Sequence, residues 1–307
     1  MTEFRTITEG LRFPEGPIAM PDGSVVLVEI EAGRLTRVLP DGTKETVAET
    51  GGGPNGAAIG PDGACYICNN GGFIWEDTPE RLRPVGQGDD YKGGRIERVD
   101  MNTGAVTVLY THCGDIQLKG PNDIVFDKQG GFYFTDLGKV RERDMDRGAL
   151  YYAQPDGSSI TEVAFPIITP NGVGLSADEK TVYVAETETS RLWSYEVIAP
   201  GELKTEPFPS VNGGKLVAGL PGYQRFDSLA LDSAGNVCVG TLIRGGVTVV
   251  SPDGQDVEHI ATPDMYCTNI CFGGPELKTA YLTQSFTGKL IAMDWPRPGL
   301  PLNFLNE

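Results

Sequence analysis

The stretch Phe13-Pro14-Glu15-Gly16-Pro17, followed by the turn Pro21-Asp22-Gly23, sets a spacing that recurs along the whole chain. In this stretch the carboxylate residue Glu15 lies eight positions before Gly23 of the turn. A polar residue precedes a turn by the same eight positions in every later copy. The six polar residues are Glu15, Asn55, Asn122, Asn171, Asp227 and Thr268. Because a packed position would accept an apolar residue, this shared polarity indicates that six side chains converge on one place.

The units around these residues share one order of elements: polar residue, apolar strand, turn, second strand, loop, third strand, turn and fourth strand. Asp-Gly turns such as Pro40-Asp41-Gly42 separate the short strands, and these turns favour the positive φ that hairpins need. Six antiparallel units of roughly 40 to 65 residues predict an all-β fold, a six-bladed β-propeller with four strands per blade. We expect one domain over residues 1–307. Two stacked β-sandwiches are the alternative, but they do not explain six units in one register.

The sixth unit lacks a clear fourth strand, and two segments are candidates to supply it. Residues 4–8 would close the ring from the N-terminus, and residues 302–305 would close it from the C-terminus. Closure by the N-terminal segment removes two exposed sheet edges, so we favour it.

Three long connections, 70–93, 137–147 and 199–226, are expected to surround one mouth of the propeller channel. In a propeller the first residue of each inner strand lies at one mouth, and the loops between second and third strands return to it. These connections carry aromatic residues such as Trp75 and Tyr223. Long loops on a rigid scaffold are usually functional, so this mouth is the predicted site.

The composition excludes several classes of partner. A formal net charge of −17 disfavours binding to nucleic acid or to an anionic membrane, because both need clustered Lys and Arg. No apolar window approaches the roughly 18 residues of a membrane span. The first residues have no apolar segment typical of a signal peptide, so we expect a cytoplasmic protein. The six cysteines are expected to be reduced, and Cys65 and Cys68 should point to opposite faces of one strand.

Glu15, Asn122, Asn171 and Asp227 would bring two carboxylates and two carboxamides together at the channel. Such oxygen ligands suit one hard divalent cation, with Ca²⁺ favoured and Mg²⁺, Mn²⁺ or Zn²⁺ as alternatives. A cation held by only two negative ligands keeps positive charge and acts as a Lewis acid. The ends of the second strands offer further polar residues for substrate contact, among them Asn69 and Asp136. His112 and His259 have no partner at a recognisable spacing, and no hydrolase nucleophile motif is present.

Four strings resemble the signature segments of the SMP-30/gluconolactonase/luciferin-regenerating-enzyme-like family, which includes the diisopropylfluorophosphatase-type propellers. The strings are Phe13-Pro14-Glu15-Gly16-Pro17, Gly120-Pro121-Asn122-Asp123, Thr169-Pro170-Asn171-Gly172-Val173 and Phe226-Asp227-Ser228-Leu229-Ala230-Leu231-Asp232. The resemblance implies a catalytic divalent metal held by Glu15, Asn171 and Asp227. It makes Asn122 a fourth ligand or a substrate-positioning amide, and Asp227 the general base, or the nucleophile in the phosphatase-like branch.

The resemblance further implies a metal-dependent hydrolase that opens a lactone ring, with a sugar 1,4- or 1,5-lactone as the expected substrate. Asp227 would activate water, and Asn122 would help to stabilise the oxyanion. The predicted substrate contacts are Asn55, Asn69, Lys119, Asp136, Trp75, Tyr223 and Thr268. Some sugar lactonases of the family carry an arginine where this chain has Gly120, and the aromatic insertion makes the mouth more apolar than a sugar site needs.

Two other functions stay open at this point. One is hydrolysis of an organophosphate, an aryl ester or a non-sugar lactone at the same metal site. The other is a non-catalytic propeller that serves as a binding module around a structural ion. In the favoured reading the partner is a small-molecule lactone or ester, and the protein is a monomer or a small homo-oligomer.

Overall fold

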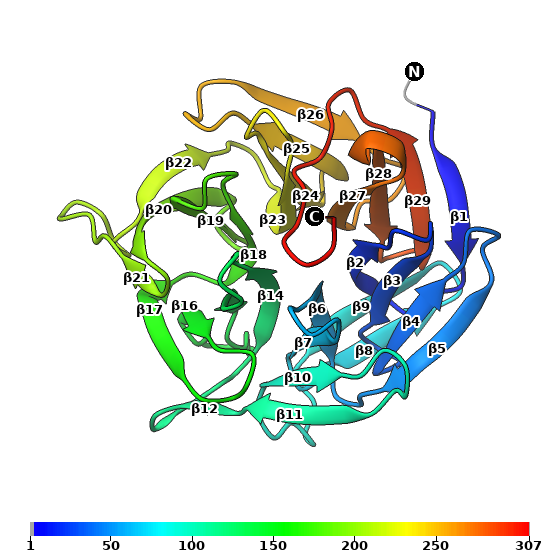
Figure 1. The fold of residues 1–307 in the computed structure, drawn as a ribbon, viewed down its shortest axis with the longest axis horizontal. Helices are drawn as coiled ribbons and strands as arrows, with labels where there is room; N and C mark the ends of the chain where they lie inside the picture. Colours follow the sequence, from blue (N-terminus) through cyan, green and yellow to red (C-terminus); the bar gives the residue numbers. More distant parts are fainter. Residues whose placement is uncertain (1–2, 307) are drawn as a thin grey trace.

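Six antiparallel sheets form a ring around a central channel in the computed structural model, which describes residues 3–306 (Figure 1). The inner strand of each sheet lines the channel. The inner strands are β2 (Pro14–Ala19), β6 (Pro54–Ile59), β14 (Pro121–Phe126), β18 (Pro170–Leu175), β23 (Arg225–Leu231) and β27 (Cys267–Gly273). We call the end at which these strands begin the site mouth, and the other end the far mouth. The predicted six-bladed β-propeller is confirmed.

Three further strands complete each blade outward from the channel. The second strands are β3 (Val25–Glu29), β7 (Cys65–Asn69), β15 (Phe132–Asp136), β19 (Thr181–Glu186), β24 (Val237–Leu242) and β28 (Thr279–Gln284). The third are β4 (Arg34–Val38), β10 (Arg95–Val99), β16 (Gly148–Ala153), β20 (Arg191–Ala199), β25 (Gly246–Val250) and β29 (Lys289–Asp294). The outer are β5 (Lys44–Glu49), β11 (Val106–Tyr110), β17 (Ile160–Ile167), β22 (Lys215–Gly219), β26 (Val257–Ala261) and β1 (Arg5–Glu9).

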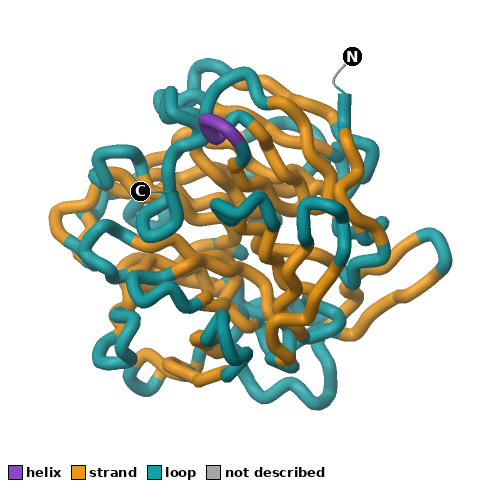
Figure 2. Tube along the Cα trace, turned by 45° about the vertical axis from the view of Figure 1, so that its right-hand side comes forward, coloured by secondary structure: helices purple, strands orange, loops and turns teal. Residues whose placement is uncertain are grey.

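Short elements outside the blades are few. They are the hairpin β8 (Ile74–Thr78) and β9 (Arg81–Gly86), the hairpin β12 (His112–Cys113) and β13 (Ile116–Gln117), β21 (Glu202–Leu203) and η1 (Pro275–Leu277). The one-turn 3-10 helix η1 is the purple segment of Figure 2 and the only helix within residues 3–306. No helix in this part of the chain has the length and apolar character needed to cross a membrane.

The N-terminal segment closes the ring, as the sequence predicted. β1 pairs with β29, and Arg5 lies opposite Ala292 in this ladder. The alternative segment, residues 302–305, instead crosses the far mouth, where the red end of the chain lies over the centre of the ring (Figure 1). Asn303 Nδ2 donates to the carbonyl of Phe126 at 3.0 Å, which ties this tail to the end of β14.

Two of the three long connections differ from the prediction. Residues 70–93 are not irregular, because they contain the β8–β9 hairpin. Residues 199–226 do not all lie at the site mouth, since β20 runs from the site mouth to the far mouth and β22 runs back. Gly201 therefore lies near the far end, where its N–H donates to Tyr133 Oη at 3.1 Å. Only the last residues of this connection reach the site mouth.

Neighbouring blades pack face to face through large buried side chains. Between the second and third blades, the rings of Tyr66 and Phe126 lie 5.1 Å apart in an edge-to-face arrangement, with Phe132 and Phe134 beside them. All six cysteines are free. Cys65 and Cys68 lie in two different core clusters, so the predicted opposite orientation of these side chains is confirmed.

A β-bulge interrupts every inner strand, at the polar residue of the repeat or directly after it. An extra residue in one strand changes the alternation of side chains locally. At this point the inner strands also approach one another closely. A Cβ atom on Gly56 would lie 2.4 Å from the carbonyl oxygen of Asn122, and one on Gly16 would lie 2.6 Å from that of Asn55. Glycine therefore allows the backbones of adjacent blades to meet around the channel.

Replacing Gly56 with Ala should destabilise the protein by about 1–3 kcal/mol, because the new methyl group forces two packed backbones apart. Denaturant unfolding at equilibrium measures this loss. Gly219→Ala is the matched control, since the nearest atom to its Cβ is 3.7 Å away, the Cγ of Arg191. Equal stability of the two variants would contradict the close approach of the inner strands.

Candidate active site

The four predicted metal ligands lie at the site mouth, each at the start of a different inner strand. Glu15, Asn122, Asn171 and Asp227 are buried, with exposed fractions between 2% and 8%. A contact connects two of these strands in neighbouring blades: Ser228 Oγ donates to Asn171 Oδ1 at 3.3 Å. The structure thus brings the predicted set to one end of the channel.

Glu15 is held in place by two donors on a single oxygen. Asn269 Nδ2 and the backbone N–H of Gly16 each donate to Glu15 Oε2 at 2.8 Å. Burial raises the pKa of Glu15 to about 7, and the hydrogen bonds from Asn269, Gly16 and Thr268 act in the opposite direction. The carboxyl group is therefore oriented, but its charge is poorly compensated by the protein.

The side-chain carbonyl oxygens of Asn122 and Asn171 differ in their hydrogen bonding: that of Asn171 accepts from Ser228, and that of Asn122 has no partner. Asn122 Oδ1 is buried and has no hydrogen-bond partner. Asn171 Nδ2 donates to Thr187 Oγ1 at 3.1 Å, which fixes the orientation of its amide. A buried acceptor without a partner costs about 1–3 kcal/mol, so the Asn122 oxygen is a position where a ligand would be favourable.

Three buried carboxyl groups in this region lie within range of one another's charge: Glu15, Asp227 and Asp123. Burial, followed by the charge of Glu15, raises the pKa of Asp227 well above its usual value, although Asn171 and the Ser228 N–H lower it. Burial and the charge of Glu15 also raise the pKa of Asp123 to about 7, against hydrogen bonds from the N–H groups of Val173 and Ile124. Added positive charge would favour the ionised form of all three carboxyl groups.

These observations fit a divalent cation. The donor set of two carboxylates and two carboxamides is that of a hard cation such as Ca²⁺. Within residues 3–306 no group of three or more His, Cys, Asp or Glu side chains is placed to hold a metal by itself. The amide oxygens of Asn122 and Asn171 would therefore be required, and the unpaired Asn122 Oδ1 meets that requirement.

Sequence reasoning missed three residues that directly follow polar residues of the repeat. Asp123, Ser228 and Asn269 would face away from the channel in a regular strand, but the bulge turns them toward it. Asp123 accepts hydrogen bonds from the N–H groups of Ile124 and Val173, and so connects the third and fourth blades. The available signal was the polar pair in Asn122-Asp123 and in Asp227-Ser228, since polar neighbours are uncommon in a buried strand.

Two predicted substrate contacts already have all their hydrogen bonds within the protein. Asn69 Oδ1 accepts from the N–H groups of Gly53 and Gly71, and Asn69 Nδ2 donates to Gly51 O and to Glu97. Asp136 likewise accepts from the backbone N–H groups of residues 119, 120 and 138. These side chains support the loops at the site mouth and offer little to a ligand.

The other predicted contacts are more widely spread. Asn55 lies at the start of its inner strand with the ligand set, and Thr268 hydrogen-bonds to Thr283 and Ser285. Lys119 and Trp75 are half-buried, while Tyr223 is 72% exposed.

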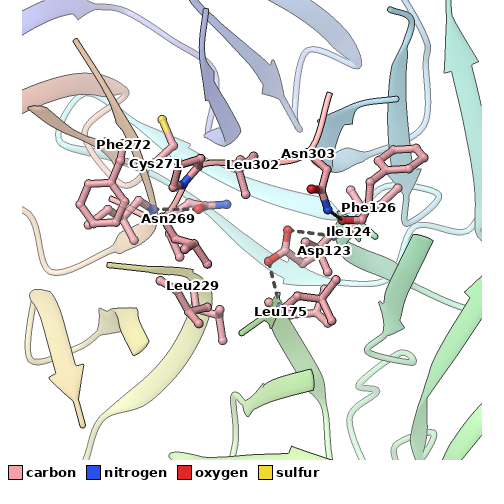
Figure 3. Close-up of a pocket in the computed structure, with 18 of the residues that line it drawn as sticks. Asp123, Ile124, Phe126, Leu175, Leu229, Asn269, Cys271, Phe272, Leu302 and Asn303 are labelled. Carbon is pink, nitrogen blue, oxygen red and sulfur yellow. Dashed lines mark hydrogen bonds between the residues drawn. The ribbon is translucent and has the colours of Figure 1, made fainter. Parts of the chain in front are cut away.

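The far half of the channel contains a cavity of about 290 Å³, shown in Figure 3. Apolar residues such as Leu229 and Phe272 form its walls, and Leu302 and Asn303 of the C-terminal tail close it. Asp123 and Asn269 supply polar groups to the lining. None of the four predicted metal ligands lines this cavity, but Asn269, which does, donates a hydrogen bond to Glu15, so the cavity reaches the residues next to the candidate site.

Comparison with known proteins identifies the family of this chain. Residues 13–286 match the model of the SMP-30/gluconolactonase/LRE-like region. The chain belongs to the SMP-30/gluconolactonase/LRE-like family. The span starts two residues before Glu15 and includes all four candidate ligands.

Named relatives of this family member include lactonases. It is 30% identical to Lactonase drp35 of Staphylococcus haemolyticus over 259 residues, which cover 83% of this chain and 71% of that protein. It is 31% identical to Lactonase drp35 of Staphylococcus saprophyticus over 257 residues, which again cover 83% of this chain and 71% of that protein.

Solved structures share the fold at lower identity. A gluconolactonase from Xanthomonas campestris superposes with a TM-score of 0.74 at 22% identity, over 96% of this chain and 90% of that one. The calcium-binding protein regucalcin from Agrobacterium tumefaciens superposes with a TM-score of 0.76 at 18% identity. The superposition covers 100% of this chain and 98% of that one. These two likenesses support the six-bladed fold of the family.

A buried lysine connects two of the loops at the site mouth. Lys139 Nζ donates to the carbonyl of Gly72 at 3.1 Å and lies 4.4 Å from the ring centre of Phe73. Burial lowers the pKa of Lys139 to about 8, although Asp136 and Asp146 raise it.

The titration of Lys139 should appear in the pH dependence of stability. Because its pKa is lower in the folded state, the unfolded chain binds more protons between about pH 8 and pH 10.5. Over this range the wild type should gain about 3 kcal/mol relative to Lys139→Met, measured by denaturant unfolding. A stability difference that does not change with pH would show that Lys139 is not desolvated.

Proposed function

We propose that this protein is a metal-dependent hydrolase that opens lactone rings at the site mouth. The observation that carries the proposal is the placement of four buried oxygen donors, Glu15, Asn122, Asn171 and Asp227, at the starts of four inner strands, with the carbonyl oxygen of Asn122 unpartnered. The relatives named lactonase and gluconolactonase support the reaction class. The sequence expectation of a sugar 1,4- or 1,5-lactone belongs to this proposal.

Glu15, Asn122, Asn171 and Asp227 would hold the cation, with Ca²⁺ favoured because all four donors are oxygens. When bound, a divalent cation supplies positive charge that polarises a carbonyl group and lowers the pKa of water. The hydrogen bonds from Asn269 and Gly16 would keep Glu15 oriented for this role.

Asp227 would act as the general base. Its carboxylate takes a proton from water while the water oxygen attacks the lactone carbonyl carbon, and the ring C–O bond then breaks. The proton returns from Asp227 to the ring oxygen, so the product is a hydroxy acid. The Asn122 amide would donate to the developing negative charge on the carbonyl oxygen. Burial of Asp227 favours this role because it raises the pKa of the carboxyl group, which makes its carboxylate a stronger base.

Asp227→Asn should lower kcat for lactone hydrolysis by at least about a hundredfold, since general base catalysis commonly contributes this much. A pH-indicator assay on a panel of lactones, with each divalent metal added to chelator-treated protein, measures the effect. Chelation should abolish wild-type turnover, and metal should restore it in the wild type but not in Asp227→Asn.

The matched control for this experiment is Asp115→Asn, an exposed aspartate in the β12–β13 hairpin, which should retain full activity. Circular dichroism confirms that each variant is folded. Undiminished turnover in Asp227→Asn, or in protein that is free of metal, would contradict the mechanism.

Asn122→Leu provides a test that does not depend on activity. Replacing a buried acceptor that has no partner by an apolar group of similar size should leave the metal-free protein equally stable or more stable. The same change removes one ligand, so the increase in Tm on adding Ca²⁺ should shrink. An unchanged Ca²⁺-dependent Tm shift would contradict the assignment of Asn122 as a ligand.

A further inference from the structure

The cavity in the far half of the channel has space for a ligand that the proposed reaction does not use. Its volume of about 290 Å³ is close to the lower limit for small-molecule sites, roughly 300 Å³. All six inner strands contribute to its wall, and residues 300–303 cover it. Leu302 of this tail and Ala177 of the turn after β18 line the cavity and are also exposed, so a small molecule can enter from the far mouth.

Most of the cavity wall is apolar. Leu229 and Leu231 come from β23, and Ile270 and Phe272 come from β27. Figure 3 shows Leu229 and Phe272 beside the cavity, with Leu302 of the tail next to them. Water makes few hydrogen bonds against such walls, so an apolar group that displaces it is favoured.

The charged residues of the wall have one sign. Asp123 and Glu179 line the cavity, and within residues 3–306 no Lys, Arg or His does. Glu179 has partners outside the cavity, because Lys128 Nζ lies 3.9 Å from its carboxylate and Asn303 Nδ2 donates to it at 2.7 Å. Asp123 is therefore the acidic group that is left for a ligand.

Asp123 has only neutral hydrogen-bond partners. The N–H groups of Ile124 and Val173 donate to it at 3.0 and 3.2 Å, and the hydroxyl of Ser228 contributes a further hydrogen bond. The charge of nearby Glu15 is also negative. A carboxylate has about four acceptor positions, so Asp123 can accept one more donor from the cavity. A buried carboxylate is stabilised most by a donor that carries positive charge.

The divalent cation proposed above does not meet this need. Its two positive charges balance the two negative charges of Glu15 and Asp227, and Asp123 is not among its four candidate ligands. The third carboxylate then still lacks a counter-charge. A single positive charge on the cavity side of Asp123 would supply it.

We propose that the far cavity binds a small organic cation: a primary ammonium group carried by one aromatic ring or a short alkyl chain. The ammonium group donates to Asp123, and the apolar body lies against Leu229 and Phe272. The acidic wall disfavours anions of the same shape. This binding site is additional to the proposed hydrolase activity and is reached from the other end of the channel.

Four probes at about pH 8, where primary amines are protonated, separate these requirements: benzylamine, benzyl alcohol, phenylacetate and methylamine. Isothermal titration calorimetry on the full chain with Ca²⁺ present measures their binding. Benzylammonium should bind about tenfold more tightly than benzyl alcohol, for one charge-assisted hydrogen bond. Phenylacetate and methylammonium should not bind measurably. Methylammonium also controls for non-specific attraction of amines to a chain with a net charge of −17.

Two variants locate the bound molecule. Ala230 is half-buried and lines the cavity, so Ala230→Leu takes up space that the ring needs and should weaken benzylammonium binding at least about tenfold. The matched control is Ala234→Leu, at an exposed alanine of the β23–β24 turn that does not line the cavity, and it should bind as the wild type does. Asp123→Asn should remove the preference for benzylammonium over benzyl alcohol.

Anomalous diffraction from wild-type crystals soaked in 4-bromobenzylamine tests the position without any substitution. We expect a bromine peak inside the cavity and the ligand nitrogen about 3 Å from an oxygen of Asp123. A bromine peak only on the outer surface would overturn the inference. So would equal affinity of the wild type for benzylammonium and benzyl alcohol, or unchanged binding in a folded Ala230→Leu variant.

A bromine peak in the cavity without binding in solution would mean binding at crystal concentration only, and this result also rejects the inference. None of these measurements uses turnover. A wild type that hydrolysed no lactone would therefore contradict the proposed function and leave the cation site standing.

Discussion

The β-bulge at the start of each inner strand governs how the centre of this molecule is built. It turns two consecutive side chains of a strand toward the channel, so six strands deliver two layers of groups to one end of it. Glycines such as Gly16 and Gly56 allow the bulged backbones to meet. The first layer provides the candidate ligands, and the second provides Asp123, Ser228 and Asn269, which hydrogen-bond to neighbouring strands and to those ligands.

Burying several carboxyl groups close together disfavours their ionised forms, and this explains why the site suits a cation. Glu15, Asp123 and Asp227 are buried within range of one another's charge, and burial raises the pKa of each. A divalent cation would reverse these shifts, because opposite charge favours ionised carboxylates. The candidate base and the candidate cation site thus depend on the same group of carboxylates.

Much of the fold could be predicted because it is a repeat. The polar residue at one register predicted the number of blades, and edge closure correctly favoured residues 4–8 over 302–305. The second layer was missed, because simple alternation sends Asp123 and Asn269 away from the channel and the bulge depends on contacts between blades. The roles of Asn69 and Asp136 in holding loops were also hidden, since their partners are backbone N–H and C=O groups that no pattern of side chains reveals.

The central claim is that Glu15, Asn122, Asn171 and Asp227 together bind one divalent cation at the site mouth. Anomalous diffraction from crystals grown with Mn²⁺ in place of Ca²⁺ tests it most directly, because the peak locates the metal independently of activity. We predict one strong peak within about 2.0–2.6 Å of an oxygen from each of these four side chains. A peak elsewhere in the channel, or an ordered site without metal at saturating Mn²⁺, would contradict the account.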